Sequence, residues 1–327
     1  MKRIGSITAS FMLACASAGA IEEPPFPGGW HADLSASQYR IGLDFETRHG
    51  GKGAGFIEPR VAHPEAPANG SVVQTISAKN YRGKRLRFAA FVKTKDLDKR
   101  AQLWTLVWRS SPDSSDSVEA PEIKTDADWT RYAIEFSVAD DAVTIECGLR
   151  LVGRGRAWID DASLEVVGKP DDRVLKLIPG QAQEPPPGLP SSLENADFEQ
   201  PKLVYDLALA QGVWEIEDGG NYDPLVVRST KLIAGNKATV ASYDKDGKIL
   251  SESTTEFSLD QSGRVSLITH RNLEITAGLG KGGKAPPGIS TSNVYAINRI
   301  QFTEICGTLD GSGFSPNLLK WKRVESK

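Results

Sequence analysis

Two tryptophans spaced four residues apart are the best candidates for ligand contact in this chain. They lie in QLWTLVWRS, whose alternation is typical of a β-strand. Successive side chains of a strand point to opposite faces, so Trp104 and Trp108 share one face. If the other face enters a core, the two indoles form an exposed platform on which a sugar ring stacks. The alternative is that both belong to the core. Arg109, Arg87 and Glu135 are candidates for polar contacts to the same ligand.

Other residue types that often carry out chemistry do not form a catalytic motif here. The four histidines lie far apart and lack the spacing of metal ligands. Neither H-E-x-x-H nor G-x-S-x-G occurs. The stretch TAGLGKGGKAPPG has the glycine spacing of phosphate-binding loops, but Pro286 and Pro287 argue against the helix that must follow. We therefore expect a mobile basic loop around Lys281 at the barrel mouth rather than a phosphate site. A lid over a ligand that Lys281, Tyr222 and His270 contact is the alternative function of this loop.

Composition limits the classes of function. The chain has 327 residues, of which 39% are hydrophobic and 25% charged, as in globular proteins. Its formal net charge of −3 gives no reason to expect a nucleic acid partner, because such binding needs a concentrated basic face. Beyond the N-terminus, no apolar run approaches the roughly 20 residues of a transmembrane segment.

Residues 1–20 are predicted to be a signal peptide. The basic start MKR precedes a short apolar stretch, and AGA ends it with the small-x-small pattern of a cleavage site. We expect cleavage before Ile21 and export to the periplasm or the medium. Cys15 in MLAC offers an alternative, a lipid anchor, but the residues before it depart from the usual lipoprotein signal.

Two cysteines, Cys147 and Cys306, follow the predicted cleavage site. An oxidising compartment permits a disulfide, although the two lie in different halves of the chain. Cys147 is in phase with Ile145 and Leu149, so we favour a buried thiol that acts as a small hydrophobe. Neither cysteine has a C-x-x-C partner, and a zinc or redox site is not indicated.

A proline-rich segment divides the chain. Residues 169–195 contain PPPGLPSS, which is typical of an extended linker. We expect a first domain at 21–168 and a second at 196–327, each of ordinary size. Both consist of short alternating runs separated by turn residues, without a long helical period. The sequence therefore predicts two all-β domains.

Three stretches of the first domain follow one another as strands: NYRGKRLRFAAFVKTKDL, DWTRYAIEFSV and AWIDDASLEVV. Together they resemble the galactose-binding-like jelly-roll β-sandwich, over a range from about Trp30 to Val167. The Trp-apolar-Asp-Asp pattern before the last strand is the most specific part. Many carbohydrate-binding modules share this fold, so the resemblance implies a glycan partner, although the fold hosts many functions.

The same resemblance implies a structural calcium ion at the edge of the sandwich. Ca²⁺ takes about 6–8 oxygen ligands. Asp160 and Asp161, with Asp44 and the carbonyls of its glycine-rich turn, are the candidate ligands. The alternative is a β-bulge whose carboxylates accept local N–H groups. As neighbours on a strand, Asp160 and Asp161 point to opposite faces and cannot flank one substrate as acid and base.

The second domain contains about eight strand-like runs, most of them joined by tight turns such as AGNK and DKDGK. Eight sequential strands predict an up-and-down barrel. Gly212-x-Trp214 in the first strand and Arg323 in the last resemble lipocalins, in which the tryptophan closes the barrel floor beneath a basic residue. A cation–π contact is the implied geometry. The segment ENADFEQ (194–200) resembles the opening of another sandwich module, but the hairpins after it favour a barrel.

These observations predict an exported, non-catalytic binding protein. The sandwich is expected to recognise a glycan, and the barrel interior has room for side chains or for one small apolar molecule. Two alternatives stay open. An enzyme at the barrel mouth would require Tyr222, His270 and Lys281 to meet in one pocket with perturbed pKa values. A structural or interaction protein of the cell envelope would use both domains as adhesive surfaces.

Overall fold

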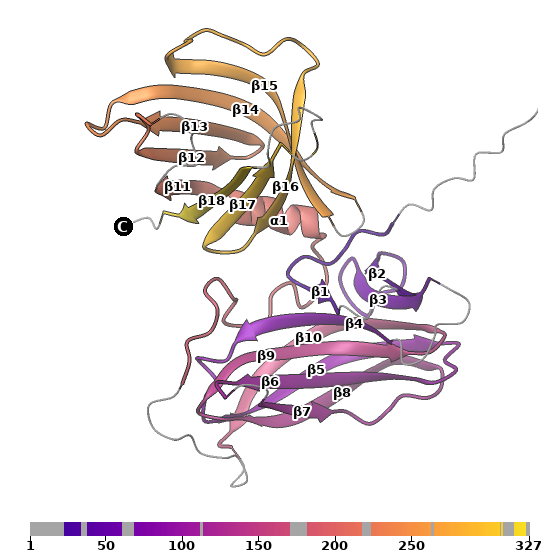
Figure 1. Ribbon diagram of the computed structural model, residues 1–327. Coiled ribbons are helices and arrows are strands. Elements are labelled where there is room, and N and C mark those ends of the chain that lie inside the picture. Colours follow the sequence, from indigo (N-terminus) through magenta and orange to yellow (C-terminus); the bar gives the residue numbers. More distant parts are fainter. Residues whose placement is uncertain are drawn as a thin grey trace, which may run out of the picture.

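The chain folds into a β-sandwich and a closed β-barrel, as Figure 1 shows, which confirms the predicted all-β class. The computed structural model describes residues 23–33, 38–60, 69–111, 114–170, 182–217, 224–262, 265–307, 309 and 317–324. The predicted signal peptide with Cys15, and Tyr222 of the second domain, lie outside the described residues.

The sandwich consists of two five-stranded antiparallel sheets. The first sheet has the strand order β1 (His31–Ala32), β4 (Asn69–Ser77), β9 (Ala142–Val152), β6 (Arg100–Arg109) and β7 (Ser115–Glu119). The second has the order β2 (Tyr39–Asp44), β3 (Ala54–Pro59), β10 (Arg156–Gly168), β5 (Lys84–Lys95) and β8 (Ala127–Val138).

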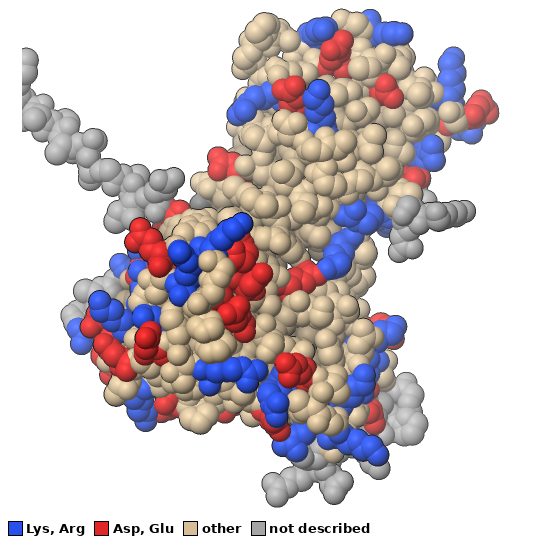
Figure 2. All heavy atoms as spheres, turned by 180° about the vertical axis from the view of Figure 1, so that it is seen from behind, with Lys and Arg blue, Asp and Glu red and all other residues tan. Residues whose placement is uncertain are grey.

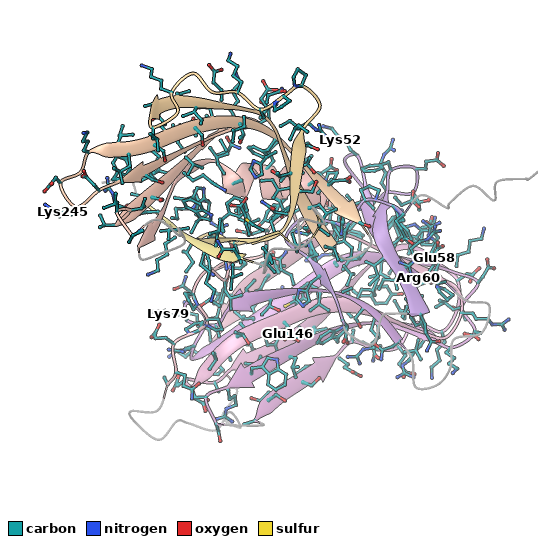
Figure 3. All side chains as sticks on the ribbon, turned by 45° about the horizontal axis from the view of Figure 1, so that its top comes forward. Lys52, Glu58, Arg60, Lys79, Glu146 and Lys245 are labelled. Carbon is teal, nitrogen blue, oxygen red and sulfur yellow. The ribbon has the colours of Figure 1, made fainter. Side chains whose placement is uncertain are left out.

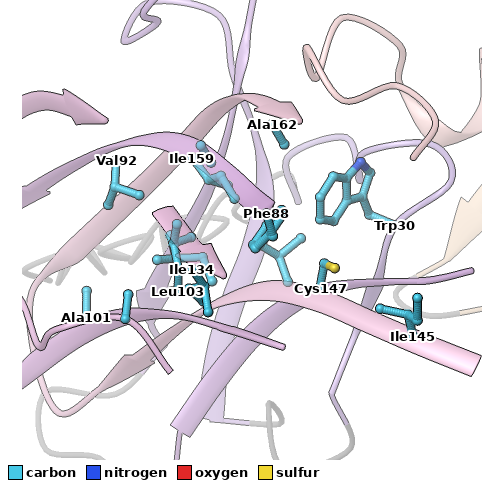
Figure 4. Close-up of a cluster of buried hydrophobic side chains, with 14 of the residues drawn as sticks. Trp30, Phe88, Val92, Ala101, Leu103, Ile134, Ile145, Cys147, Ile159 and Ala162 are labelled. Carbon is cyan, nitrogen blue, oxygen red and sulfur yellow. The ribbon is translucent and has the colours of Figure 1, made fainter. Parts of the chain in front are cut away.

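The core lies between these sheets and follows from the alternation in the sequence. On β6, Leu103 packs into the core, as Phe88 and Val92 do on β5 (Figure 4). Each such side chain contributes about 1.5–3 kcal/mol when it leaves water. Cys147 is fully buried in the same cluster, where burial raises the pKa of its thiol well above the usual value. No disulfide joins Cys147 to Cys306.

The segment before the barrel packs onto the sandwich. Phe198 is fully buried, and its ring stacks on Trp30 with 4.6 Å between centroids. Trp30 Nε1 donates to the Asn195 carbonyl at 3.1 Å, and Ala162 N donates to the Ala196 carbonyl at 2.8 Å. The expected domain boundary at 195/196 therefore falls inside a segment that completes the sandwich core. The sequence-based interpretation missed this because apolar residues in a short segment between two domains do not reveal which domain buries them.

The barrel is built from eight sequential antiparallel strands and closes by pairing of its first and last strands. The strands are β11 (Gly212–Glu217), β12 (Arg228–Ala234), β13 (Lys237–Tyr243), β14 (Ile249–Ser262), β15 (Val265–Gly278), β16 (Ser290–Ile297), β17 (Gln301–Cys306) and β18 (Asn317–Arg323). A single described helix, α1 (Lys202–Ala210), directly precedes the first strand and packs beside the barrel (Figure 1).

Trp214 closes the end of the barrel that lies against α1. Its indole N–H donates to the Ala210 carbonyl at 2.8 Å, and its side chain is completely buried. The Arg323 guanidinium carbon lies 4.2 Å from the centre of the ring and Nη1 donates to the Gln211 carbonyl at 2.8 Å. Gly212 has φ of +111°, a conformation that favours glycine. This explains why a glycine stands at the start of the Gly-x-Trp motif.

Candidate functional site: a sandwich face and an interdomain cavity

Strand β6 presents its tryptophans on the outer face of the first sheet. Ala101, Leu103 and Val107 belong to the core cluster. The alternate residues, Trp104 and Trp108 among them, therefore point away from the core. This is the outer-face alternative of the two that the sequence left open.

The two tryptophans differ in what covers them. Trp108 is 40% exposed, and its Nε1 donates to Glu146 Oε1 on the neighbouring strand at 3.0 Å. Trp104 is only 5% exposed, because the Arg150 guanidinium lies 4.8 Å from the centre of its ring. Arg150 is held there by a 3.0 Å bond to Glu119. Of the predicted pair, Trp108 is the one whose ring is exposed.

Glu146 is the acceptor beside this ring, and sequence reasoning did not single it out. Burial raises the pKa of its carboxyl, the Trp108 N–H opposes the shift, and the negative charge of Asp33 adds to it. Within the described part of the chain, no group donates to its second oxygen. The signal was present in VTIECGLRL, where Ile145 and Cys147 point inward and place Glu146 on the outer face.

A cavity of about 480 Å³ lies beside this face, where the two domains meet. Its lining comes from four parts of the molecule: the first sheet, the linker, α1 and the β16–β17 turn. The residues are Gly29, His31, Thr75, Thr144, Pro186, Gly188, Leu189, Pro190, Glu194, Tyr205, Leu209, Ile297, Asn298 and Arg299. Such a volume falls within the ~300–1,000 Å³ of ligand pockets.

Two residues of the cavity lining are cross-strand neighbours of Trp108 and Glu146. Thr144 is the cross-strand partner of Trp108, and Thr75 is the partner of Glu146. Neighbouring strands lie about 4.8 Å apart, so the cavity begins one strand away from the Trp108–Glu146 pair. Figure 3 labels Glu146 on the sandwich, below the barrel in that view. Trp108 and Glu146 therefore lie next to Thr144 and Thr75, the sheet residues at which the cavity lining begins.

The other polar residues predicted for this site lie elsewhere. Arg109 Nε bonds Asp141 at 2.7 Å, and both side chains are nearly buried, so this guanidinium is engaged in an ion pair. Arg87 pairs with Glu135 at 2.6 Å between β5 and β8, which belong to the second sheet. The structure therefore does not bring these three side chains to Trp108.

The three aspartates predicted to bind calcium accept hydrogen bonds instead. Asp44 Oδ2 accepts from Arg156 and from Trp158 Nε1, both at 2.9 Å. Asp160 Oδ2 accepts from the backbone N–H of His49 at 2.9 Å. Burial raises the pKa of Asp160 to about 6 against the effect of its N–H donors.

Asp161 contacts the ring of His49, with 2.7 Å between Oδ2 and Nδ1. Among the described residues, no three potential metal-ligating side chains of His, Cys, Asp or Glu form a cluster. The hydrogen bonds around Asp160 match the β-bulge alternative, and β10 has a register shift between Asp160 and Ser163. Calcium at this edge stays a prediction.

The barrel interior holds a buried ionic cluster. Lys231 Nζ forms an ion pair with Glu304 Oε2, and His270 Nε2 lies 3.2 Å from Glu304 Oε1. Trp321 Nε1 donates to the same carboxylate at 3.0 Å. Burial alone would raise the pKa of Glu304, but Lys231 and His270 together hold it well below its ordinary value. Each charge in this cluster has a partner.

The residues of the enzymatic alternative are not assembled in the described structure. His270 lies inside the barrel beside Glu304, and its Nδ1 is 3.1 Å from Thr255 Oγ1. Lys281 is exposed in the loop between β15 and β16. Tyr222 lies outside the described residues, so its distance to His270 and Lys281 is not part of this description.

The surface adds two observations. On the face shown in Figure 2, Lys and Arg are interspersed with Asp and Glu on both domains, so the described residues of that face form no large patch of one sign. In the described part of the chain, no helix has the length and apolar character needed to cross a membrane.

No protein-family model matches the chain. The chain is 29% identical over 154 residues to an uncharacterised HTH-type transcriptional regulator, YbfP, of Bacillus subtilis (strain 168). The match spans 46% of this chain and 52% of the regulator, so the chain covers about half the length of this curated relative.

Similar solved structures include carbohydrate-binding modules. One is the CBM22-1–GH10 part of endo-1,4-β-D-xylanase 10B from Clostridium thermocellum, at 14% identity and a TM-score of 0.35, covering 45% of this chain and 27% of that one. Another is the CBM22-1 xylan-binding domain of Paenibacillus barcinonensis Xyn10C, at 15% identity and a TM-score of 0.34, covering 45% and 90%. The assignment of function to this chain therefore rests on the geometry of its own site.

Proposed function

We propose that the outer face of the first sandwich sheet binds a glycan without catalysing a reaction. The observation that carries this proposal is the Trp108–Glu146 pair, an exposed indole ring with a carboxylate fixed beside it at 3.0 Å. A sugar ring offers an apolar C–H face and a rim of hydroxyl groups. The indole matches the first, and the carboxylate accepts from the second.

The surroundings of the pair favour binding over a purely structural role. The hydrogen bond to Glu146 fixes the orientation of the Trp108 ring before ligand arrives, which lowers the entropic cost of binding. Thr144 and Thr75 add hydroxyl groups in the same rows. An aromatic surface with a few convergent polar groups beside a cavity is the usual form of a small-ligand site.

Two finer parts of the expected function stay predictions. Export depends on residues 1–20, which lie outside the described part of the chain. A small apolar ligand in the barrel would have to share the interior with Trp321, Phe302 and the Lys231–Glu304 pair, all of them buried there.

A glycan array probed with the mature protein tests the proposal. The matched variants are Trp108→Ala and Trp129→Ala, since Trp129 is a partly exposed tryptophan on the second sheet. We expect Trp108→Ala to abolish binding and Trp129→Ala to retain it, with both variants folded by circular dichroism. A folded wild-type protein that binds no glycan, or a Trp108→Ala variant that binds equally well, would show that the proposal is wrong.

A further inference from the structure

We propose that this site recognises the end of a glycan chain rather than its interior, an inference that rests on the proposed function. The sheet face leads from Trp108 toward β4, and the cavity at that side is open to solvent but bordered by the linker, α1 and the barrel. A chain lying across the strands from the Trp108 ring therefore terminates in the cavity.

The linker forms the first part of this wall. Ser77 N, at the end of β4, donates to the Pro190 carbonyl at 2.8 Å. Gln74 exchanges two hydrogen bonds with the backbone of Glu194, at 2.9 Å through Nε2 and at 2.7 Å through Oε1. These contacts fix the linker against strand β4, next to the cavity.

The barrel contacts the linker directly. Arg299 in the β16–β17 turn forms an ion pair with Glu194, and the Tyr205 hydroxyl donates to the same carboxylate. A Cβ atom on Gly188 would lie 2.7 Å from Asn298 Oδ1, so the linker backbone touches the barrel turn directly. The wall is therefore continuous from the sandwich to the barrel.

Helix α1 holds the wall in place because it is attached to both domains. A Cβ atom on Gly28 would lie 2.3 Å from the Tyr205 Cβ, so this tyrosine packs tightly on the sandwich. The next residue, Asp206, accepts a 2.8 Å hydrogen bond from Tyr295 inside the barrel and pairs with Lys202. A wall fixed on both sides does not open without breaking buried contacts.

The alternative route for a chain, along strand β6, is also obstructed. In that direction the face continues to Trp104, which is covered by Arg150 and its partner Glu119. The open approach is from the β7 edge, across Trp108 and Glu146. A chain that approaches in this way has its end among His31, Asn298 and Arg299, and the rest of the chain extends away from the barrel.

The experiment counts binding sites on a polysaccharide before and after it is cut. Equal masses of soluble xylan, mixed-linkage β-glucan and galactan, intact or partly hydrolysed by an endo-acting enzyme, are titrated into the full chain by calorimetry. Chain-end recognition predicts that the number of sites per mass rises in proportion to the new ends. Interior recognition predicts an unchanged or falling number, which would overturn the inference.

Two variants separate this inference from the proposed function. Thr75→Trp fills the cavity and is expected to abolish binding, whereas Thr75→Val keeps the cavity open and should weaken binding by no more than about tenfold, the effect of one hydrogen bond. A folded Thr75→Trp variant with full affinity would show that no chain end enters the cavity, even if Trp108→Ala still abolishes binding. Absence of binding to every polymer and digest would overturn both proposals.

Discussion

Two indole–glutamate pairs in this protein have the same geometry and opposite surroundings. In the barrel, Trp321 Nε1 donates to Glu304 at 3.0 Å, and on the sandwich face Trp108 Nε1 donates to Glu146 at the same distance. Glu304 is fully enclosed and paired with Lys231 and His270, which hold its pKa low. Glu146 is half-buried, and desolvation together with the charge of Asp33 raises its pKa.

The difference shows how one residue pair serves stability in one place and recognition in another. A buried carboxylate that lacks a positive partner is costly, so the barrel satisfies Glu304 completely. Glu146 keeps an oxygen without a donor in the described structure, and its indole partner keeps an exposed ring. A ligand can donate a hydrogen bond to this carboxylate oxygen and can stack on the exposed ring.

The largest expected effect comes from removing the charge of Glu304. In Glu304→Gln the buried Lys231 loses its counter-charge, and we expect the barrel to lose about 3–5 kcal/mol of unfolding free energy. The matched variant Glu146→Gln should change stability by less than about 0.5 kcal/mol, as for ordinary surface positions. Urea denaturation of both variants checks the contrast. Equal losses at the two sites would remove the distinction between the pairs.

A second contrast removes the indole N–H together with the five-membered part of the ring. Trp321→Phe leaves a buried carboxylate oxygen with one donor fewer, at an expected cost of about 1–3 kcal/mol of stability. Trp108→Phe should leave the melting temperature nearly unchanged, because water replaces the lost donor, but should lower glycan affinity by releasing the ring. Calorimetry of unfolding and of binding separates the two effects. A Trp108→Phe variant that melts like Trp321→Phe would contradict this assignment.

The two carboxylates should also respond to acid in different ranges. The pKa of Glu304 is lowered in the fold, so its stabilisation is complete above its unfolded value of 4.5 and is lost as pH falls through the lowered pKa. The pKa of Glu146 is raised, so this carboxyl is protonated at a higher pH than Glu304. As the pH is lowered, glycan affinity should therefore be lost before the barrel weakens. Binding and melting measured from pH 7 to pH 3 give the two midpoints. Coincident midpoints would show that loss of binding reflects unfolding.

The smallest expected effect is that of calcium on the sandwich. The N–H groups that donate to Asp160 and Asp44 present positive ends to the oxygens that a cation would need. If these donors take the place of a cation, calcium and chelator shift the melting temperature of the protein equally little. A stabilisation of about 2.7 kcal/mol, as for a ligand at one hundred times its Kd, that disappears in Asp161→Asn would establish the calcium site.

Much of the fold could be predicted because it depends on local pattern. Alternation in the first domain placed Leu103 and Trp108 on opposite faces of one strand, since a strand has only two faces, and the structure decided which face enters the core. Tight turns between eight runs predicted sequential pairing, and Gly212, Trp214 and Arg323 marked the ends of a closed barrel. The candidate site was predicted less well, because Arg109 is bound to Asp141 and Trp104 is covered by Arg150.

The sequence by itself determined the two β domains, the shared strand face of Trp104 and Trp108 and the strand positions that close the barrel, because each depends on periodicity or on turns within a few residues. Only the tertiary structure decided that Glu146 would lie beside Trp108 and that Phe198 would return to the sandwich. It also decided that Glu194, Tyr205 and Arg299 would enclose one cavity. These contacts join residues far apart in the chain, and their formation depends on packing and solvent exclusion between elements, which local sequence does not specify.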